Sequence, residues 1–151
     1  MADALLGGFL EKKAFKKDNV VVSDIAEERR DFMHDKFGVR VTGDNTALCD
    51  QLKIIVLAVK PQVMDEVLEE IAPMVTQDHL LVSIAAGYPL SKMEAILGED
   101  KRLVRVMPNT PSKIGAGATG YCLGKHATQD DAETVELMLN SVGVTCQVQE
   151  S

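Results

Sequence analysis

Small, polar or bendable residues stand directly after several apolar runs of this sequence. They are Ser23, Asp24, Asn45, Lys60, Pro61, Ala85, Ala86, Gly87, Pro108, Asn109 and Thr110. Such residues suit a nucleotide site, because the backbone must approach sugar and phosphate closely without bulky side chains in between. Taken singly they favour simpler roles: Gly87 a turn, Lys60 a solvated charge, and Asn45 the cap of a helix at 46–52. Their recurrence after successive apolar runs points to a binding site.

The elements that would position these residues alternate between strand and helix. Strands are predicted at residues 18–24, 53–59, 79–87, 102–109 and 144–149. Helices are predicted at residues 1–10, 26–38, 46–52, 61–75, 90–98 and 128–143. The glycine-rich residues 111–124 predict a loop and an edge strand. This alternation is typical of βαβ units, so we expect an α/β fold with a doubly wound, mostly parallel sheet whose ligand lies at the carboxyl ends of the strands.

The composition narrows the class of protein. The chain has 151 residues and a net charge of −7, which argues against a nucleic-acid partner or an anionic membrane surface. Its longest apolar run, residues 54–59, is far shorter than the roughly 20 residues of a membrane span, and no secretory signal precedes it. A cytoplasmic protein is expected.

Cysteine, histidine and acidic residues often form catalytic or metal sites in proteins, but their spacing in this sequence favours a simpler interpretation. The three cysteines are widely spaced, without a C-x-x-C pair, and are interpreted as reduced thiols rather than metal ligands or a disulfide. The three histidines, His34, His79 and His126, are predicted to lie on the surface. No metal cluster, paired carboxylates or Ser/His/Asp set is evident, so no catalytic residue is assigned.

Several strings, in this order and spacing, resemble one enzyme family. They are "DN" at 44–45, "LAVKPQ" at 57–62, "SIAAG" at 83–87, "LVRVMPNTP" at 103–111 and "GAGATGY" at 115–121. Together they are similar to pyrroline-5-carboxylate reductase, which catalyses the last step of proline biosynthesis, and the resemblance covers essentially the whole chain. It implies a homo-oligomeric reductase that uses NADPH or NADH, with a Rossmann-type N-terminal domain and a helical C-terminal dimerisation domain.

The resemblance also assigns site residues. It implies that Asn45, Val59, Lys60 and Ala86 contact the dinucleotide, and that Asp24 reads the adenosine ribose. Met107, Asn109 and Thr110 belong to the loop beside the nicotinamide. Simpler alternatives stay open: Val59 and Ala86 as core residues, Lys60 as a charge at a helix start, and Asn109 as a turn former. A cyclic imine is itself electrophilic once protonated, so hydride transfer to it depends more on placement than on a protein acid.

Relatives of this kind begin with a strand and a loop of the form G-x-G-x-M-A. Met1 and Ala2 match the last two positions of that loop, so both are expected near the dinucleotide. Residues 1–151 are therefore expected to be a partial Rossmann domain that lacks the first strand and the glycine-rich loop, without the C-terminal helical domain. We expect two half-sheets with unpaired edges, weak or no dinucleotide binding and no activity from this chain alone.

Two questions remain open at this point. Asp24 can accept hydrogen bonds from a ribose 2′-OH but repels a 2′-phosphate, so a reduced preference for NADPH is expected unless Arg29 and Arg30 offset it or Asp24 only caps the next helix. For the function, the alternatives are a related Rossmann reductase of the hydroxyacid dehydrogenase class and a non-catalytic truncated isoform.

Overall fold

The structure is a computed structural model that describes residues 2–11, 16–107, 117–140 and 143–147. Its α-helices are α1 (Ala2–Glu11), α2 (Glu27–Phe37), α3 (Asn45–Gln51), α4 (Met64–Ile71), α5 (Leu90–Leu97) and α6 (Gln129–Leu139). Its strands are β1 (Val21–Ser23), β2 (Arg40–Thr42), β3 (Ile54–Leu57), β4 (Leu80–Ser83), β5 (Arg102–Met107), β6 (Gly117–Leu123) and β7 (Gly143–Gln147). Single 3-10 turns form η1 (Lys17–Asn19), η2 (Pro61–Val63) and η3 (Ala72–Met74). The predicted alternation is confirmed, and β2 is a strand that the sequence pattern did not predict.

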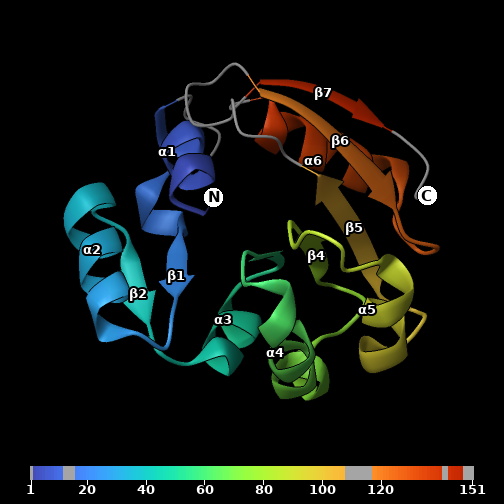
Figure 1. The fold of residues 1–151 in the computed structure, drawn as a ribbon, viewed down its shortest axis with the longest axis horizontal. Coiled ribbons are helices and arrows are strands. Elements are labelled where there is room, and N and C mark those ends of the chain that lie inside the picture. The colour runs from blue at the N-terminus through green and yellow to red at the C-terminus, as the bar shows by residue number, and fades with distance from the viewer. Residues whose placement is uncertain (1, 12–15, 108–116, 141–142, 148–151) are drawn as a thin grey trace.

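The strands form two sheets in the part of the chain that the structure describes (Figure 1). One is the parallel pair β1–β2, and the other has the order β3-β4-β5-β6-β7. In the larger sheet β3, β4 and β5 are parallel, while β6 runs antiparallel to β5 and parallel to β7. The expectation of two half-sheets is confirmed, with the division between β1 and β3.

Strand β6 corrects one prediction. The glycine-rich residues 111–124 were expected to supply an edge strand, but β6 pairs on both sides, with β5 and with β7. The physical reason is strand pairing, because residues 104–107 of β5 lie along one edge of β6 and residues 143–147 of β7 lie along the other. Tyr121 also packs on one face of the sheet and Cys122 on the other. Both faces of β6 are therefore covered at that point, as they are in an interior strand.

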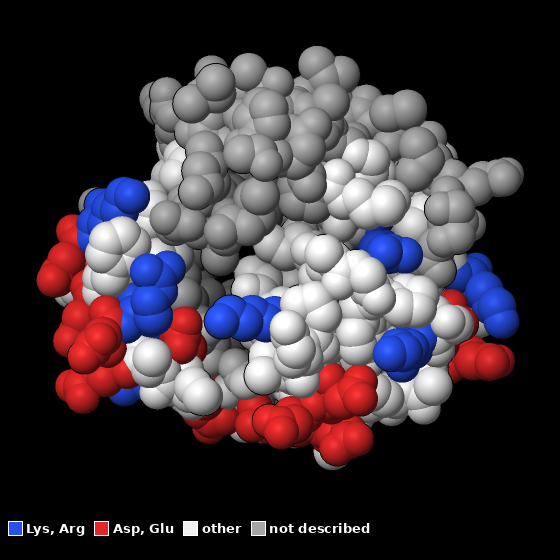
Figure 2. Space-filling view, viewed as in Figure 1, with Lys and Arg blue, Asp and Glu red and all other residues white. Residues whose placement is uncertain are grey.

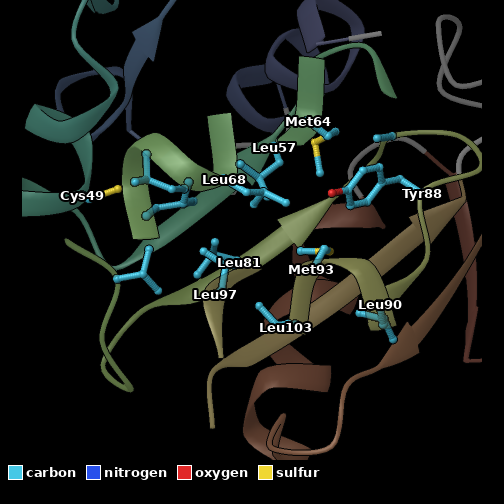
Figure 3. Packing of buried hydrophobic residues seen from close by; sticks show 14 of the residues in the cluster. Cys49, Leu57, Met64, Leu68, Leu81, Tyr88, Leu90, Met93, Leu97 and Leu103 are labelled. Carbon is cyan, nitrogen blue, oxygen red and sulfur yellow. The ribbon is translucent and has the colours of Figure 1, made fainter. Parts of the chain in front are cut away.

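The larger sheet is covered on both faces, which makes the fold doubly wound. On one face Leu57, Leu81 and Leu103 pack with residues of α4 and α5 (Figure 3). On the other face Val82 and Val104 pack with residues of α6. Successive residues of a strand point to opposite faces, so a strand buried on both must be almost entirely apolar. The predicted α/β, Rossmann-type, mostly parallel fold is confirmed.

Helix α1 contacts the cores of both sheets. Leu6 packs with Met33 and Val39, which belong to the cluster beside the β1–β2 pair. Phe9, one turn further along, packs in the cluster between the larger sheet and α6. Both residues lie on the apolar face that the spacing predicts, and both are buried. This helix therefore connects two sheets that share no strand.

Two helix ends show how local sequence sets the boundaries. Gly38 ends α2 with a φ of 70°, as predicted, and its N–H donates to the carbonyl of His34 at 2.8 Å. At the start of α3 the cap is Asp44, whose carboxylate accepts from the N–H of Thr46, so the assignment of Asn45 as the cap is wrong. Asn45 is the first residue inside the helix, which leaves its side chain for other contacts.

His79 is a second correction. It was predicted to be a surface residue, but only 4% of it is exposed. Its Nε2 lies 2.6 Å from the carbonyl oxygen of Cys49, and its Nδ1 accepts from the N–H of Thr76 at 3.0 Å. The ring therefore joins the end of α3 to the turn before β4, two segments that are distant in sequence. Cys49 and Cys122 are buried free thiols.

Candidate functional site

The first group of candidate residues lies where β1 ends and α3 begins. Ser23, the last residue of β1, donates a hydrogen bond from its Oγ to Oδ1 of Asn45 at 2.5 Å. Asp44 caps the same helix, and the hydrogen bond from the Thr46 hydroxyl is the main reason that the pKa of its carboxyl is lowered. The hydrogen bond between Ser23 and Asn45 fixes the Asn45 side chain against the carboxyl end of β1, although the two residues are distant in sequence.

The second group surrounds Asp24, the residue after β1. Its Oδ1 accepts from the N–H of Ala26 at 2.9 Å, while Ala26 itself is the N-cap of α2. Nη1 of Arg30 donates to the carbonyl oxygens of Asp24 at 2.9 Å and Ile25 at 3.2 Å. The N–H of Asp24 donates to the carbonyl of Thr42 at 3.1 Å, which joins this loop to the end of β2. Asp24 thus helps to order the start of α2 and remains half-exposed at the edge of the sheet.

The third group lies at the carboxyl ends of β3, β4 and β5. Leu57 is opposite Ser83, and Ser83 is opposite Arg105, so the three parallel strands end at one edge. Ala58, Lys60 and Ala86 follow these strands and are exposed. A side chain added at Gly87, whose φ is 71°, would meet no atom within 4 Å. Small residues beside open space leave the backbone accessible, which is what a nucleotide site requires.

Tyr88 and Asp65 are residues of this region that the sequence reasoning missed. The Tyr88 ring is buried beside Met64 and Met93 (Figure 3), and its hydroxyl donates to Oδ1 of Asp65 at 2.5 Å. Burial, and after it the Asp65 carboxylate, raise the pKa of Tyr88 to about 12. The pair ties the loop after β4 to the first turn of α4. An aromatic residue directly after "AAG" is the only sequence signal that could have indicated it.

The predicted site residues fall into two groups. Ser23, Asp24 and Asn45 lie together at the end of the β1–β2 pair, and Lys60 and Ala86 lie at the end of the larger sheet. Met107, the last residue of β5, is exposed near the second group. Met1, Asn109 and Thr110 lie outside the described residues, and the side chain of Ala2, the first residue of α1, is not described either.

The simpler alternatives can also be checked against burial. Val59 is half-buried and packs against the core cluster, as its core interpretation requires. Ala86 is exposed, so the core interpretation is wrong for this residue. Lys60 is the N-cap of η2 without a side-chain cap hydrogen bond, and its ammonium group is exposed. Lys60 and Ala86 are therefore both accessible to a ligand.

Charged side chains gather on separate parts of the described surface. Figure 2 shows acidic side chains gathered over α2 and along the side of α4, with a hollow in the described surface between these regions. Basic side chains lie beside the hollow in the same view. Within the described residues, no group of three His, Cys, Asp or Glu side chains could hold a metal ion, and no helix is long and apolar enough to cross a membrane.

Comparison with known proteins identifies relatives along the whole chain. It is 37% identical over 151 residues to a pyrroline-5-carboxylate reductase of Methanosarcina acetivorans, covering 100% of this chain and 56% of that protein. It is 36% identical over 152 residues to pyrroline-5-carboxylate reductase 3 of Mus musculus, covering 100% of this chain and 55% of that protein. The resemblance found in the sequence is confirmed, and the chain spans about half the length of these relatives.

Solved structures agree with these relatives. A pyrroline-5-carboxylate reductase from Coxiella burnetii superposes with a TM-score of 0.93 at 31% identity, over 99% of this chain and 56% of that one. The Plasmodium falciparum pyrroline carboxylate reductase, solved with NADP bound, gives a TM-score of 0.87 at 30% identity, over 98% of this chain and 53% of that one. An Aquifex aeolicus prephenate dehydrogenase, at 15% identity and a TM-score of 0.79, shares the fold alone.

A family match defines the class of protein. Residues 1–87, more than half of the 151, match the family described as NADP oxidoreductase, coenzyme F420-dependent. That match spans the β1–β2 pair, the Ser23–Asn45 contact and the ends of β3 and β4, where the accessible residues of the candidate site lie. The chain therefore belongs to this family of NADP-dependent oxidoreductases, and its cofactor is a nicotinamide dinucleotide.

Proposed function

We propose that this chain is the dinucleotide-binding part of a reductase that converts 1-pyrroline-5-carboxylate to L-proline with NADPH or NADH. The observation that carries the proposal is the match to the reductase of Methanosarcina acetivorans over 100% of this chain. The geometry agrees with it, because exposed Ala58, Ala86 and Gly87 leave open backbone at the carboxyl edge of a parallel sheet. The homo-oligomer that the resemblance implies is part of the same proposal.

The proposal also assigns roles to these residues, and their positions in the fold support it. Asn45, held by Ser23, and Asp24 bind the adenosine side of the dinucleotide, and Lys60 and Ala86 bind it at the ends of β3 and β4. Met107, exposed at the end of β5, lies on the nicotinamide side. The bound dinucleotide supplies the hydride. These residues bind and orient it, and none of them is assigned a proton transfer.

A full-length chimera tests the proposed activity, because this chain spans only 56% of the Methanosarcina acetivorans reductase. This chain replaces the matching 151 residues of the Methanosarcina acetivorans reductase, and every other residue of that protein is retained. We expect the folded chimera to oxidise NADPH or NADH when 1-pyrroline-5-carboxylate is added, and to sediment as an oligomer. Substitution of Asn45 by Ala in the chimera is expected to raise the KM for the dinucleotide, with a smaller effect on kcat.

Controls separate the alternatives. The activity of the parent reductase is the reference value, and circular dichroism shows whether the chimera is folded. Turnover of 2-hydroxy acids in place of the imine would favour the hydroxyacid dehydrogenase class. A folded chimera that binds NADPH without reducing the imine would contradict the proposed activity and favour a non-catalytic chain.

A further inference from the structure

The loops that carry Lys60 and Ala86 are joined behind their exposed residues. One loop follows β3 and leads through η2 into α4, and the other follows β4 and leads into α5. Lys60 and Ala86 are exposed, whereas Tyr88, two residues after Ala86, is only 3% exposed. The proposed function uses the exposed residues. Tyr88 and Asp65, which join the two loops, have no part in it.

Gly87 reverses the chain between exposed Ala86 and buried Tyr88. Its φ of 71° lies in the left-handed region, which glycine adopts readily. A Cβ there would meet no atom within 4 Å, so the backbone conformation, and not a lack of space, favours glycine at this position. The turn directs the Tyr88 ring into the core beside Met64 (Figure 3). The place of the Ala86 backbone therefore depends on where the Tyr88 ring is held.

Two helices hold the Tyr88 side chain. Its hydroxyl donates to Oδ1 of Asp65, the second residue of α4, at 2.5 Å. The ammonium group of Lys92 in α5 lies 5.4 Å from the centroid of the ring. Because burial and the Asp65 carboxylate raise the pKa of Tyr88 to about 12, the hydroxyl stays protonated and continues to donate well into alkaline pH. The loop after β4 is thus fixed to the start of α4.

A short, ordered path leads from Asp65 back to Lys60. The N–H of Val63 donates to the carbonyl oxygen of Lys60 at 3.0 Å, which closes the single turn of η2. Met64, the next residue, is fully buried and anchors the start of α4. A shift of Asp65 is therefore transmitted to Lys60 through only five residues. The contact between Tyr88 and Asp65 sets the position of one loop relative to the other.

We propose that the Tyr88 hydroxyl and the Asp65 carboxylate are a positioning pair, which holds the loops of Lys60 and Ala86 at the separation that the bound dinucleotide requires. The inference rests on the proposed function. The pair acts through the two loops and not by contact with the ligand. Binding to loops that are already ordered costs less conformational entropy, so loss of the pair weakens dinucleotide binding and leaves the hydride transfer itself unchanged.

Tyr88→Phe in the full-length chimera is the main test, because it keeps the ring and its packing and removes only the hydroxyl. We expect the KM for the dinucleotide to rise about fivefold, the factor that corresponds to one lost hydrogen bond. We expect kcat at saturating dinucleotide to stay within about twofold. Without dinucleotide, the amides of residues 84–88 should exchange hydrogen faster in the variant, while those of β5 should be unchanged.

Variants of the partner residue separate the hydrogen bond from the charge. Asp65→Ala is expected to raise the KM as much as Tyr88→Phe, and the double variant no further, because both remove the same contact. Asp65→Asn retains an oxygen that accepts from the hydroxyl, so it should restore most of the affinity. Glu66→Ala is the matched control, since it removes an exposed acidic side chain from the same turn of α4. Its KM should stay within about twofold.

Three results would overturn the inference. An unchanged KM in both Tyr88→Phe and Asp65→Ala would show that the pair does not position the loops, and dinucleotide binding by the unsubstituted chimera would still stand. An equal rise in Glu66→Ala and Asp65→Ala would assign the effect to charge alone. An unsubstituted chimera that is folded and binds neither NADPH nor NADH would refute the proposed function, and this inference with it.

Discussion

His79 shows how a single side chain holds distant segments together at the scale of the residue. Its ring satisfies the carbonyl of Cys49 at the end of α3 and the N–H of Thr76 before β4. Removal of the ring leaves both backbone groups without their partner in a buried place, and a buried group without a partner is costly. The imidazole is therefore a structural part of this fold.

We expect His79→Ala to lower the free energy of unfolding by about 2 kcal/mol, because two hydrogen bonds are lost. The measurement is the midpoint of urea unfolding followed by circular dichroism. His126→Ala is the control, since His126 is exposed, and it should change the free energy by less than about 0.5 kcal/mol. Equal effects of the two substitutions would contradict a structural role for His79.

We expect the stability of the folded chain to fall at alkaline pH because of the Tyr88 hydroxyl. Its pKa is raised from 10.0 to about 12, first by burial and then by Asp65, so the folded chain keeps this proton more tightly than the unfolded chain does. The stabilisation is complete below pH 10 and is lost as the pH rises towards about 12. Unfolding at increasing pH should show a steeper loss in the natural chain than in Tyr88→Phe. A parallel loss in both would contradict the Tyr88–Asp65 contact.

At the scale of the element, Arg102 and Asp131 connect β5 to α6. Nη1 of Arg102 donates to Oδ1 of Asp131 at 2.7 Å, and the same guanidinium donates to the carbonyl oxygens of Gln77 and Asp78. Asp131 also accepts from the N–H of Thr128 in the capping box that starts α6. One carboxylate thus fixes both the start of the helix and its position on the sheet.

Asp131→Ala is expected to destabilise the chain by about 3 kcal/mol, because the substitution leaves a half-buried guanidinium without its carboxylate and removes half of the capping box. Lys125→Ala is the control. Its ammonium group lies 4.0 Å from Glu94 and is largely exposed, so a change below about 1 kcal/mol is expected. Thermal unfolding measures both. A loss in Asp131→Ala no larger than that of the control would show that the pair contributes little.

The elements also show how far the sequence could predict the fold. Apolar runs located β3, β4 and β5, because those strands are covered on both faces. Periodic apolar residues located α4 and α5, which follow β3 and β4. Strand β2 was not predicted, since its residues Arg40–Thr42 are few and only partly buried. The interior position of β6 depends on pairing with β7 and β5, and such pairing leaves no local pattern.

The candidate site was predictable in part for the same reason. Residues directly after a strand, such as Ser23 and Lys60, follow from the strand itself. The contact between Ser23 and Asn45 depends on the way β1 and α3 pack together. His79 was misassigned because its partners are backbone groups, which every residue carries.

At the scale of the whole molecule, the two sheets should differ in stability. Strands β1 and β2 have three residues each and remain partly exposed, whereas every residue of β4 is buried. We expect the amides of β1 and β2 to exchange hydrogen faster than those of β4 and β5, through an opening that leaves the larger sheet intact. Hydrogen exchange with mass spectrometry measures this. Equal protection of both sheets would show a single cooperative unit.

Phe9→Ala in α1 gives a further test at this scale. Phe9 is buried against the larger sheet, while Leu6 of the same helix packs beside the smaller one. The substitution should cost about 3 kcal/mol and further increase exchange in β1 and β2, since α1 then anchors the smaller sheet less firmly. Gly7→Ala is the control, because a Cβ there makes only ordinary contacts with Phe37. An unchanged exchange pattern in Phe9→Ala would contradict the connecting role of α1.

The interior position of β6 has a consequence during protein synthesis. A chain leaves the ribosome from its N-terminus, so β1, α2 and β2, within residues 21–42, are available to pair early. Strand β6 can pair with β5 as soon as both have emerged, but its other side stays uncovered until residues 143–147 follow. Until then that edge of β6 exposes unpaired backbone N–H and C=O groups, which can pair with the strand of another chain.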